Sequence, residues 1–323
     1  MGRFNHSATG KGSGTSFTKI FGLITMAHLK EVVDRINLIG FTQQITQAMK
    51  MVSASKLHKI QQVLLPLKVY TRAYNRLLHR LLQAIDEGQL THPLTKAKIG
   101  QRLLVVVMGS NRGLCGAFNK NVLRAANEYI TTRQKKASTT IEVLVIGKKV
   151  HQFFKKYDIP LIERYVNLVE KANDQASSQL STYCIEAFEQ NHYTEIVLAY
   201  TAFKNSAKQE VVIVPFLPFL PNLDLATDTP PSSTRSLDYI YEPSQELLIA
   251  QLIPEILKHK MMHMLVESSA SEHAARMATM TQATDNADEL LKVLRISYNR
   301  TRQALITNSL AEITSGAEAL AET

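Results

Sequence analysis

The chain has 323 residues and a mass of 36.2 kDa, enough for one large domain or for two with separate cores. Hydrophobic residues make up 45% of it and charged residues 20%, which excludes a chain that is disordered throughout. The 37 basic residues outnumber the 28 acidic ones, so the net charge of +9 suits an acidic partner such as nucleic acid, an anionic membrane or a carboxylate-rich protein face.

Residues 1–25 carry three basic residues and no acidic one. This composition allows a targeting leader, because import peptides are basic and poor in acids. Met26 begins a stretch typical of a protein start, which favours a disordered extension before it. The expected boundaries are therefore an extension or leader at 1–25 and a first helix at 26–90.

The first helix is predicted from apolar residues that recur at steps of three and four between residues 27 and 86. Pro66 is the only proline in this stretch, and a kink is expected there. Sixty helical residues extend roughly 90 Å, which is longer than the core of a small domain.

A central α/β domain is expected at 91–227. Four short runs rich in β-branched residues have the character of buried strands, RLLVVVM, IEVLVI, EIVLAYTAF and EVVIVPF, and helix-length segments near 116–135, 148–157 and 172–190 lie between them. The alternation predicts a Rossmann-like unit with a largely parallel sheet. The last two runs are joined by the short polar KNSAKQ, which allows an antiparallel edge.

A turn-rich linker is expected at 228–242, followed by a second long helix at 243–323 that has no glycine before Gly316. Neither long helix fits on a small domain over its full length. The economical fold is an α/β domain with a long antiparallel coiled coil of the N- and C-terminal helices.

The segment GSNRGLCGAFN, Gly109 to Asn119, follows the first strand and opens a helix, where a phosphate-binding loop lies in other folds. It lacks GK[ST], and its glycines are spaced GxxxGxxG. The favoured interpretation is a tight turn in which glycines supply positive φ angles and close helix–sheet contact. We expect no cofactor, no metal and no catalytic residue here, since Cys115 has no nearby histidine in the sequence to act as a base.

The rest of the chain offers no metal or membrane signal. Cys115 and Cys184 form no CxxC pair, and His263 and His273 form no HExxH motif. The longest apolar run, VVIVPFLPFL, is short of the ~20 residues that a membrane-spanning helix needs.

Two helical stretches have unusual surfaces. Residues 41–59 are dominated by small side chains with Met49 and Met51 among them, and residues 26–90 hold nine basic against four acidic residues, which suits a carboxylate-bearing partner. In the last helix a stripe of apolar residues is interrupted at Arg300 and Gln303. The stripe is Val293, Ile296, Ile306, Leu310, Ile313, Ala317 and Leu320. The periodicity leaves two interpretations open: arginines that solvate an exposed turn, or arginines that reach carboxylates of a partner.

Three groups of motifs resemble the γ-subunit family of F-type ATP synthases. They are LKEVVDRI with ITQAMKMVSASKL, then GSNRGLCGAFN, and then SEHAARMATMTQATDNADEL with YNRTRQALIT and EITSGAEAL. The resemblance covers nearly the whole chain from Met26. It implies a non-catalytic central-stalk rotor that couples ion flow to ATP synthesis and hydrolysis.

The resemblance also implies partners and contact residues. The partners are the α and β subunits of the α3β3 ring, the ε subunit and the c ring of Fo; no nucleic acid is expected. Met49 and Lys50 face the acidic hinge segment of β, and Arg302 and Gln303 hydrogen-bond to a β loop. Membrane association is indirect, on the cytoplasmic face of a bacterial plasma membrane or, alternatively, the matrix face of the mitochondrial inner membrane.

One position departs from the family pattern. Ser309 stands where the family usually has a glutamate two residues after Ile-Thr, so a polar contact toward the helix around Arg276 is not expected from it. Glu312 lies one turn on.

Two rival functions use the same features differently. A coiled-coil scaffold for nucleic acid would use the basic surface, but its basic segments lack interleaved aromatics, and salt-dependent DNA retention would favour it. A small enzyme would bind a nucleotide on the α/β domain, and ATP binding to the purified chain would favour that.

Overall fold

The computed structural model describes residues 14–83, 92–136, 139–157, 159–168, 174–219, 242 and 244–321. The chain divides into two compact units, named here the terminal unit, Met1–Met49 with Met280–Thr323, and the central unit, Lys50–Thr279. Two long helices contribute to both units: α1 is Gly14–Gln83 and α6 is Gln245–Ala321.

The sheet of the central unit has five strands in the order β3-β2-β1-β4-β5. The strands are β1 Arg102–Met108, β2 Thr140–Ile146, β3 Leu161–Ile162, β4 Glu195–Phe203 and β5 Gln209–Leu217. The pairs β1–β2, β1–β4 and β2–β3 are parallel, and β4–β5 is antiparallel. The four predicted strands and the antiparallel edge are confirmed. The two-residue β3 was missed because it is too short to show a pattern.

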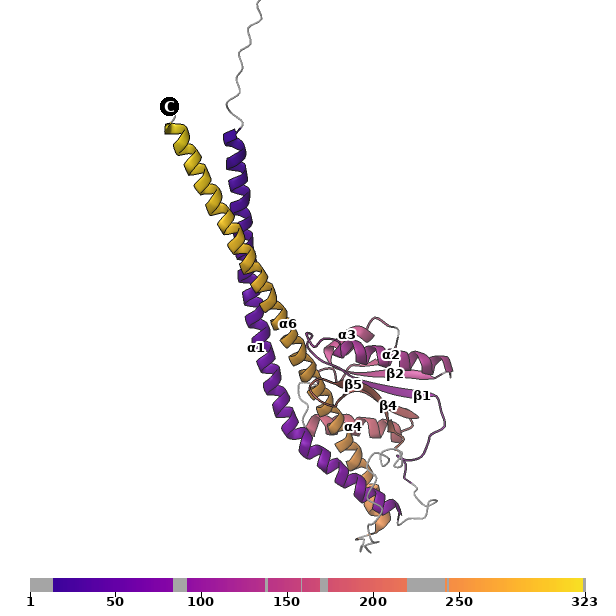
Figure 1. Cartoon of the computed structure of the whole chain (residues 1–323). Coiled ribbons are helices and arrows are strands. Elements are labelled where there is room, and N and C mark those ends of the chain that lie inside the picture. Colours follow the sequence, from indigo (N-terminus) through magenta and orange to yellow (C-terminus); the bar gives the residue numbers. More distant parts are fainter. Residues whose placement is uncertain are drawn as a thin grey trace, which may run out of the picture. The chain divides into compact units, whose positions relative to one another are not determined.

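Both faces of the sheet are buried, which explains why its strands have continuous apolar runs. Successive side chains of β1 alternate between two cores: Leu104 and Val106 point into one, Val105 and Val107 into the other. Helices α2 Phe118–Lys136 and α3 Lys148–Phe154 cover the second face, and α4 Asp174–Glu189 lies on the first (Figure 1).

The first face also receives the ends of the long helices that belong to the central unit. Leu78 and Leu81 of α1 lie in the same core as Ile253 and Leu257 of α6. A smaller cluster adds Leu57 and Leu64 of α1 and Val266, Ala270 and Ala274 of α6, packed on Phe203 of β4. The two helices are therefore held to the sheet by buried apolar surface, the main stabilising term of folding.

The domain boundaries expected from sequence remain only partly described. Helix α1 begins at Gly14, inside the expected extension, and continues through Pro66. Residues 1–13 and the expected linker, apart from Glu242, lie outside the described residues. None of the described helices has the length and apolarity that a membrane crossing requires.

Candidate functional site

The four predicted contact residues lie on the two long helices. Met49 and Lys50 of α1 are half-buried, whereas Arg302 and Gln303 of α6 are exposed. Arg302 and Gln303 are neighbours in the sequence, so α6 presents both to solvent within one turn.

In the terminal unit, α1 and α6 contact each other through side chains. Thr284 Oγ1 donates to Thr46 Oγ1 at 2.9 Å, and Gln43 Nε2 donates to Asp288 Oδ1. Position 43 faces 288 and position 46 faces 284, so the segments run antiparallel. Along that register Met49 and Arg302 lie about 20 helical residues apart, or roughly 30 Å, and form two separate contact points.

One face of α6 is covered in the terminal unit. Eight of its buried and half-buried positions form a row that steps by four and three: Met280, Thr284, Ala287, Leu291, Leu294, Tyr298, Thr301 and Leu305. The covered positions of α1 follow the same alternation: Leu29, Val32, Ile36, Ile39, Gln43 and Thr46. These two rows are called the seam. Their mean step of 3.5 residues is the period of a left-handed helix pair.

The apolar stripe that the sequence singled out on α6 does not belong to the seam. Val293, Ile296, Ile306, Leu310, Ile313 and Leu320 are all at least half exposed, and Leu320 reaches 80%. Arg300 and Gln303 are exposed with them. Helix α6 therefore carries two apolar rows in the terminal unit, the seam and an exposed stripe.

In the central unit, the loop Gly109–Asn119 connects β1 to α2. Gly116 has φ 58°, and Leu114 has φ 62° although it is not a glycine. A side chain at Gly109 would lie 2.3 Å from Val150 Cγ2. The predicted tight turn, with positive φ and close helix–sheet approach, is confirmed.

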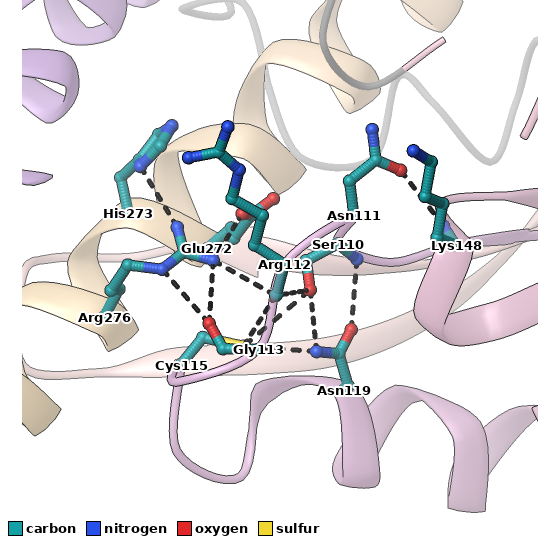
Figure 2. A network of polar contacts seen from close by, with 10 residues as sticks. All are labelled: Ser110, Asn111, Arg112, Gly113, Cys115, Asn119, Lys148, Glu272, His273 and Arg276. Atoms are coloured by element: carbon teal, nitrogen blue, oxygen red, sulfur yellow. Dashed lines mark hydrogen bonds and ion pairs between the residues drawn. The ribbon is translucent and has the colours of Figure 1, made fainter. Parts of the chain in front are cut away.

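The polar groups of this loop bind one another (Figure 2). Ser110 N donates to Asn119 Oδ1 at 3.0 Å, Asn119 Nδ2 donates to Ser110 Oγ at 2.7 Å, and Ser110 Oγ donates to the carbonyl of Arg112 at 2.6 Å. Asn119 Nδ2 also donates to Cys115 Sγ at 3.1 Å. Ser110 and Asn119 thus use their polar groups to hold the shape of the loop, and Cys115 is buried in that network rather than presented to a substrate.

Helix α6 joins the network through Arg276. Its Nη2 lies 2.7 Å from Glu272 Oε1 and donates to the backbone carbonyls of Arg112, at 3.2 Å, and Gly113, at 3.3 Å (Figure 2). Arg276 and Glu272 are each 7% exposed. Sequence reasoning named Arg276 but missed Glu272, although the spacing of four residues between an acid and a base on a helix was a visible signal.

Burial sets the protonation of the neighbouring groups. It raises the pKa of Glu272, against the opposing pull of Arg276, because a carboxylate loses its hydration there. Burial, with the positive charges of Arg276 and Lys56, lowers the pKa of His273 to about 4. At neutral pH His273 is uncharged, and Nδ1 lies 3.4 Å from Arg276 Nη1.

The described part of the chain contains no group of three His, Cys, Asp or Glu side chains placed to hold a metal ion. Burial raises the pKa of the Cys184 thiol to about 12, so it is protonated at neutral pH and is a poor nucleophile.

Comparison with known proteins gives consistent matches. The model of the ATP synthase family matches residues 28–320. The chain is 44% identical over 297 residues to the ATP synthase gamma chain of Amoebophilus asiaticus, covering 92% of this chain and 100% of that protein. It is 39% identical over 295 residues to the gamma chain of Flavobacterium psychrophilum, covering 91% and 99%.

Solved structures agree on the fold. A chain of the Euglena gracilis mitochondrial ATP synthase, in a cryo-EM structure of OSCP, F1 and the c-ring, aligns with a TM-score of 0.57 over 91% of this chain and 95% of that one. A chain of the rotor from the same organism aligns with a TM-score of 0.54, covering 87% and 99%. Both are 20% identical to this chain, a likeness that concerns the fold alone.

Proposed function

The chain belongs to the family of ATP synthase gamma chains, and from this premise we propose how its parts serve the non-catalytic central stalk of F1. The terminal unit is the shaft that turns inside the α3β3 ring, and the central unit holds the ε subunit and stands on the c ring. Rotation carries energy between ion flow through Fo and the catalytic sites of the ring. ATP is made and hydrolysed by the ring, not by this chain.

The observation that carries this proposal is the exposed stripe of α6. Its six apolar side chains, all at least half exposed, repeat over Val293 to Leu320, and a surface of this kind marks a protein contact. Of the two interpretations left open for Arg300 and Gln303, this favours contact with a partner. Covering an exposed row of apolar side chains is favourable because it removes their surface from water.

The finer architecture is an antiparallel coiled coil of the two chain ends. The seam supports it through its 3.5-residue repeat on both helices and through the bonds Thr46–Thr284 and Gln43–Asp288. In a coiled coil, one face of each helix packs on the other helix, and the opposite face is available for contact with the ring. This division explains why α6 has two apolar rows.

Four residues make the polar contacts with β in this proposal. Arg302 and Gln303 donate hydrogen bonds to a β loop, since a planar guanidinium and an amide suit directional contacts. Met49 and Lys50 face the acidic hinge segment of β. Their separation of roughly 30 Å along α1 and α6 means that the shaft meets the ring at two levels.

The membrane association follows from the complex. The chain is a peripheral part of a membrane-bound assembly, and the bacterial relatives support the cytoplasmic face of a bacterial plasma membrane as its place.

The direct test is Arg302→Ala. It should lower ATP hydrolysis by the reconstituted α3β3γ complex about tenfold, as loss of a buried interfacial arginine does, while the isolated chain unfolds as the wild type does. Arg295→Ala, the same change at an exposed position of the same helix, is the matched control and should retain activity. Wild-type turnover in Arg302→Ala would remove Arg302 from the contact.

A second test adds a positive charge at Met49, in the other of the two proposed contacts with the ring. Met49→Lys should create an attraction to the β carboxylates that holds the rotor at one angle and lowers the protons pumped per ATP. Met49→Leu keeps an apolar side chain of similar volume and should pump normally. Unaltered pumping efficiency of Met49→Lys in reconstituted vesicles would contradict the contact.

A further inference from the structure

The loop Gly109–Asn119 accepts hydrogen bonds from Arg276 of α6, and none of the contact residues proposed above takes part in this contact. We propose that Arg276, fixed by Glu272, is a positioning residue for torque transfer: it locks α6 to the sheet of the central unit so that helix and sheet turn as one body. This inference rests on the proposed rotor function and names the residues through which rotation passes from helix to sheet. The two residues and the loop are called the clasp.

The contact that Arg276 makes is directional. Its guanidinium reaches backbone carbonyls at two successive residues, Arg112 and Gly113, at 3.2 and 3.3 Å. Backbone oxygens do not change rotamer as side chains do. Glu272, one turn back on α6, accepts from the same Nη2 at 2.7 Å, and Nε donates to the Gly113 carbonyl at 3.4 Å. A buried, charged planar group that is held through two of its nitrogens is restrained in its orientation.

The loop links this contact to the neighbouring elements of the central unit. The Arg112 carbonyl that accepts from Arg276 also accepts from Ser110 Oγ, and Ser110 is bound twice by Asn119 of α2. On the other side, Lys148 N at the start of α3 donates to Asn111 Oδ1 at 3.0 Å. Hydrogen bonds therefore run without a break from α6 to Ser110, two residues beyond the end of β1, and on to Asn119 of α2, and Figure 2 draws them together with the bond to α3.

A second contact lies one turn further along the same face of α6. A Cβ at Gly116 would sit 2.8 Å from Thr279 Oγ1, so the bare backbone of the loop rests directly on that residue. Positions 276 and 279 are neighbours on a helix surface. Two contacts, one polar and one steric, fix both the rotation and the height of the helix at the loop.

The contacts of α6 next to the clasp are mostly apolar. Val266, Ala270 and Ala274 hold α6 to the unit through apolar packing. Apolar attraction is non-directional, and the two alanines offer small side chains that interlock little. The clasp adds a directional restraint to this packing, as does the bond from Tyr200 Oη of β4 to Glu267 Oε2 of α6 at 3.2 Å.

The first experiment is Arg276→Lys in the full chain, which keeps the charge but loses the planar fork. Hydrogen exchange at the Ser110 amide should quicken about tenfold to 100-fold, as expected for loss of a charge-assisted bond. In reconstituted F1Fo vesicles, ATP-driven proton pumping should fall while ATP hydrolysis continues. The matched control is Arg133→Lys, whose ion pair with Glu195 at 2.8 Å joins α2 to β4 without touching α6; it should pump as wild type.

The second experiment loosens the clasp without changing any charge. Gly116→Ala should drive the loop away from Thr279 and uncouple pumping in the same way. Adding Thr279→Ala removes the opposing atoms, and it should restore pumping if spacing at the clasp matters rather than stability of the loop.

The outcomes separate the two proposals. Pumping per ATP equal to the wild type in both Arg276→Lys and Gly116→Ala would overturn the clasp and leave the rotor function standing. A lasting defect in Gly116→Ala/Thr279→Ala would assign the effect to loop strain and overturn the clasp as well. Failure of the wild-type chain to restore any coupled pumping to a γ-depleted enzyme would overturn the rotor function and the clasp together.

Discussion

The terminal and central units use the same two helices in opposite ways. In the central unit one face of α1 and of α6 is buried against a sheet, as Leu78 and Leu257 are, while other apolar side chains of α1 such as Leu65 are exposed. In the terminal unit only a narrow seam is covered, and residues such as Phe41 and Ile313 are more than 60% exposed. The central unit covers one face of each helix with its own core. The terminal unit presents apolar surface that the proposed ring would cover.

The largest expected effect tests whether the two units differ in the burial of their apolar side chains. Phe188→Ala removes a fully buried ring from the core of the central unit and should lower the free energy of unfolding by about 3–5 kcal/mol. Phe41→Ala makes the same chemical change at an exposed site of the terminal unit and should cost less than about 0.5 kcal/mol. Urea denaturation of the isolated chain measures both. Equal costs would show that Phe41 is buried in solution.

The next effect concerns acid sensitivity in the central unit. His273 has an ordinary pKa of 6.5 when unfolded and about 4 when folded. Between these values the unfolded state binds a proton that the folded state does not, so stability is lost as the pH falls through this window. His273→Gln should remove about 2 kcal/mol of that loss, allowing for partial exposure of the ring.

Glu272 does not obscure this measurement. Its pKa is raised on folding, so its own contribution has the opposite sign and falls as the pH rises. The variant keeps Glu272, and the difference between wild type and variant therefore isolates His273 to first order. Parallel stability curves from pH 7 to pH 4 would contradict the predicted shift.

A smaller effect sharpens the description of the seam. Gln43 and Asp288 join the helices of the terminal unit, and a double-mutant cycle of Gln43→Ala with Asp288→Ala should give a coupling energy of about 1 kcal/mol. Gln44→Ala, at an exposed neighbouring position, is the control for helix propensity. A coupling near zero would mean that the helices do not meet at this register.

The smallest effect on the isolated chain is expected on the exposed stripe. Ile306→Asp should change the free energy of unfolding by less than about 0.5 kcal/mol, because the side chain is already in water. The same variant should bind the α3β3 ring poorly, since it would place a charge in a covered apolar contact. Normal assembly of Ile306→Asp would exclude Ile306 from the interface.

The strands were predictable because burial on both faces requires runs such as LLVVVM, and little else in the chain has that composition. The face of α6 that pairs with α1 was not predictable from the sequence. The seam from Met280 to Leu305 and the stripe from Val293 to Leu320 have the same spacing, and a sequence does not distinguish an apolar row covered by its own chain from one covered by another chain.

Only part of the clasp could be predicted from the sequence. The spacing of Glu272 and Arg276 indicates an ion pair, but the carbonyls that Arg276 binds belong to residues more than 160 positions earlier in the chain. Backbone acceptors leave no mark in a sequence. The glycines of the loop gave the remaining signal, since Gly116 is needed where α6 approaches.

The central claim is that the terminal unit is a shaft enclosed by a ring. Native mass spectrometry of the complex recovered on this chain tests it most directly. The account predicts a particle that holds one copy of the chain with two larger nucleotide-binding proteins, each in threefold excess. A chain recovered alone, or with its partners in equal numbers, would contradict it.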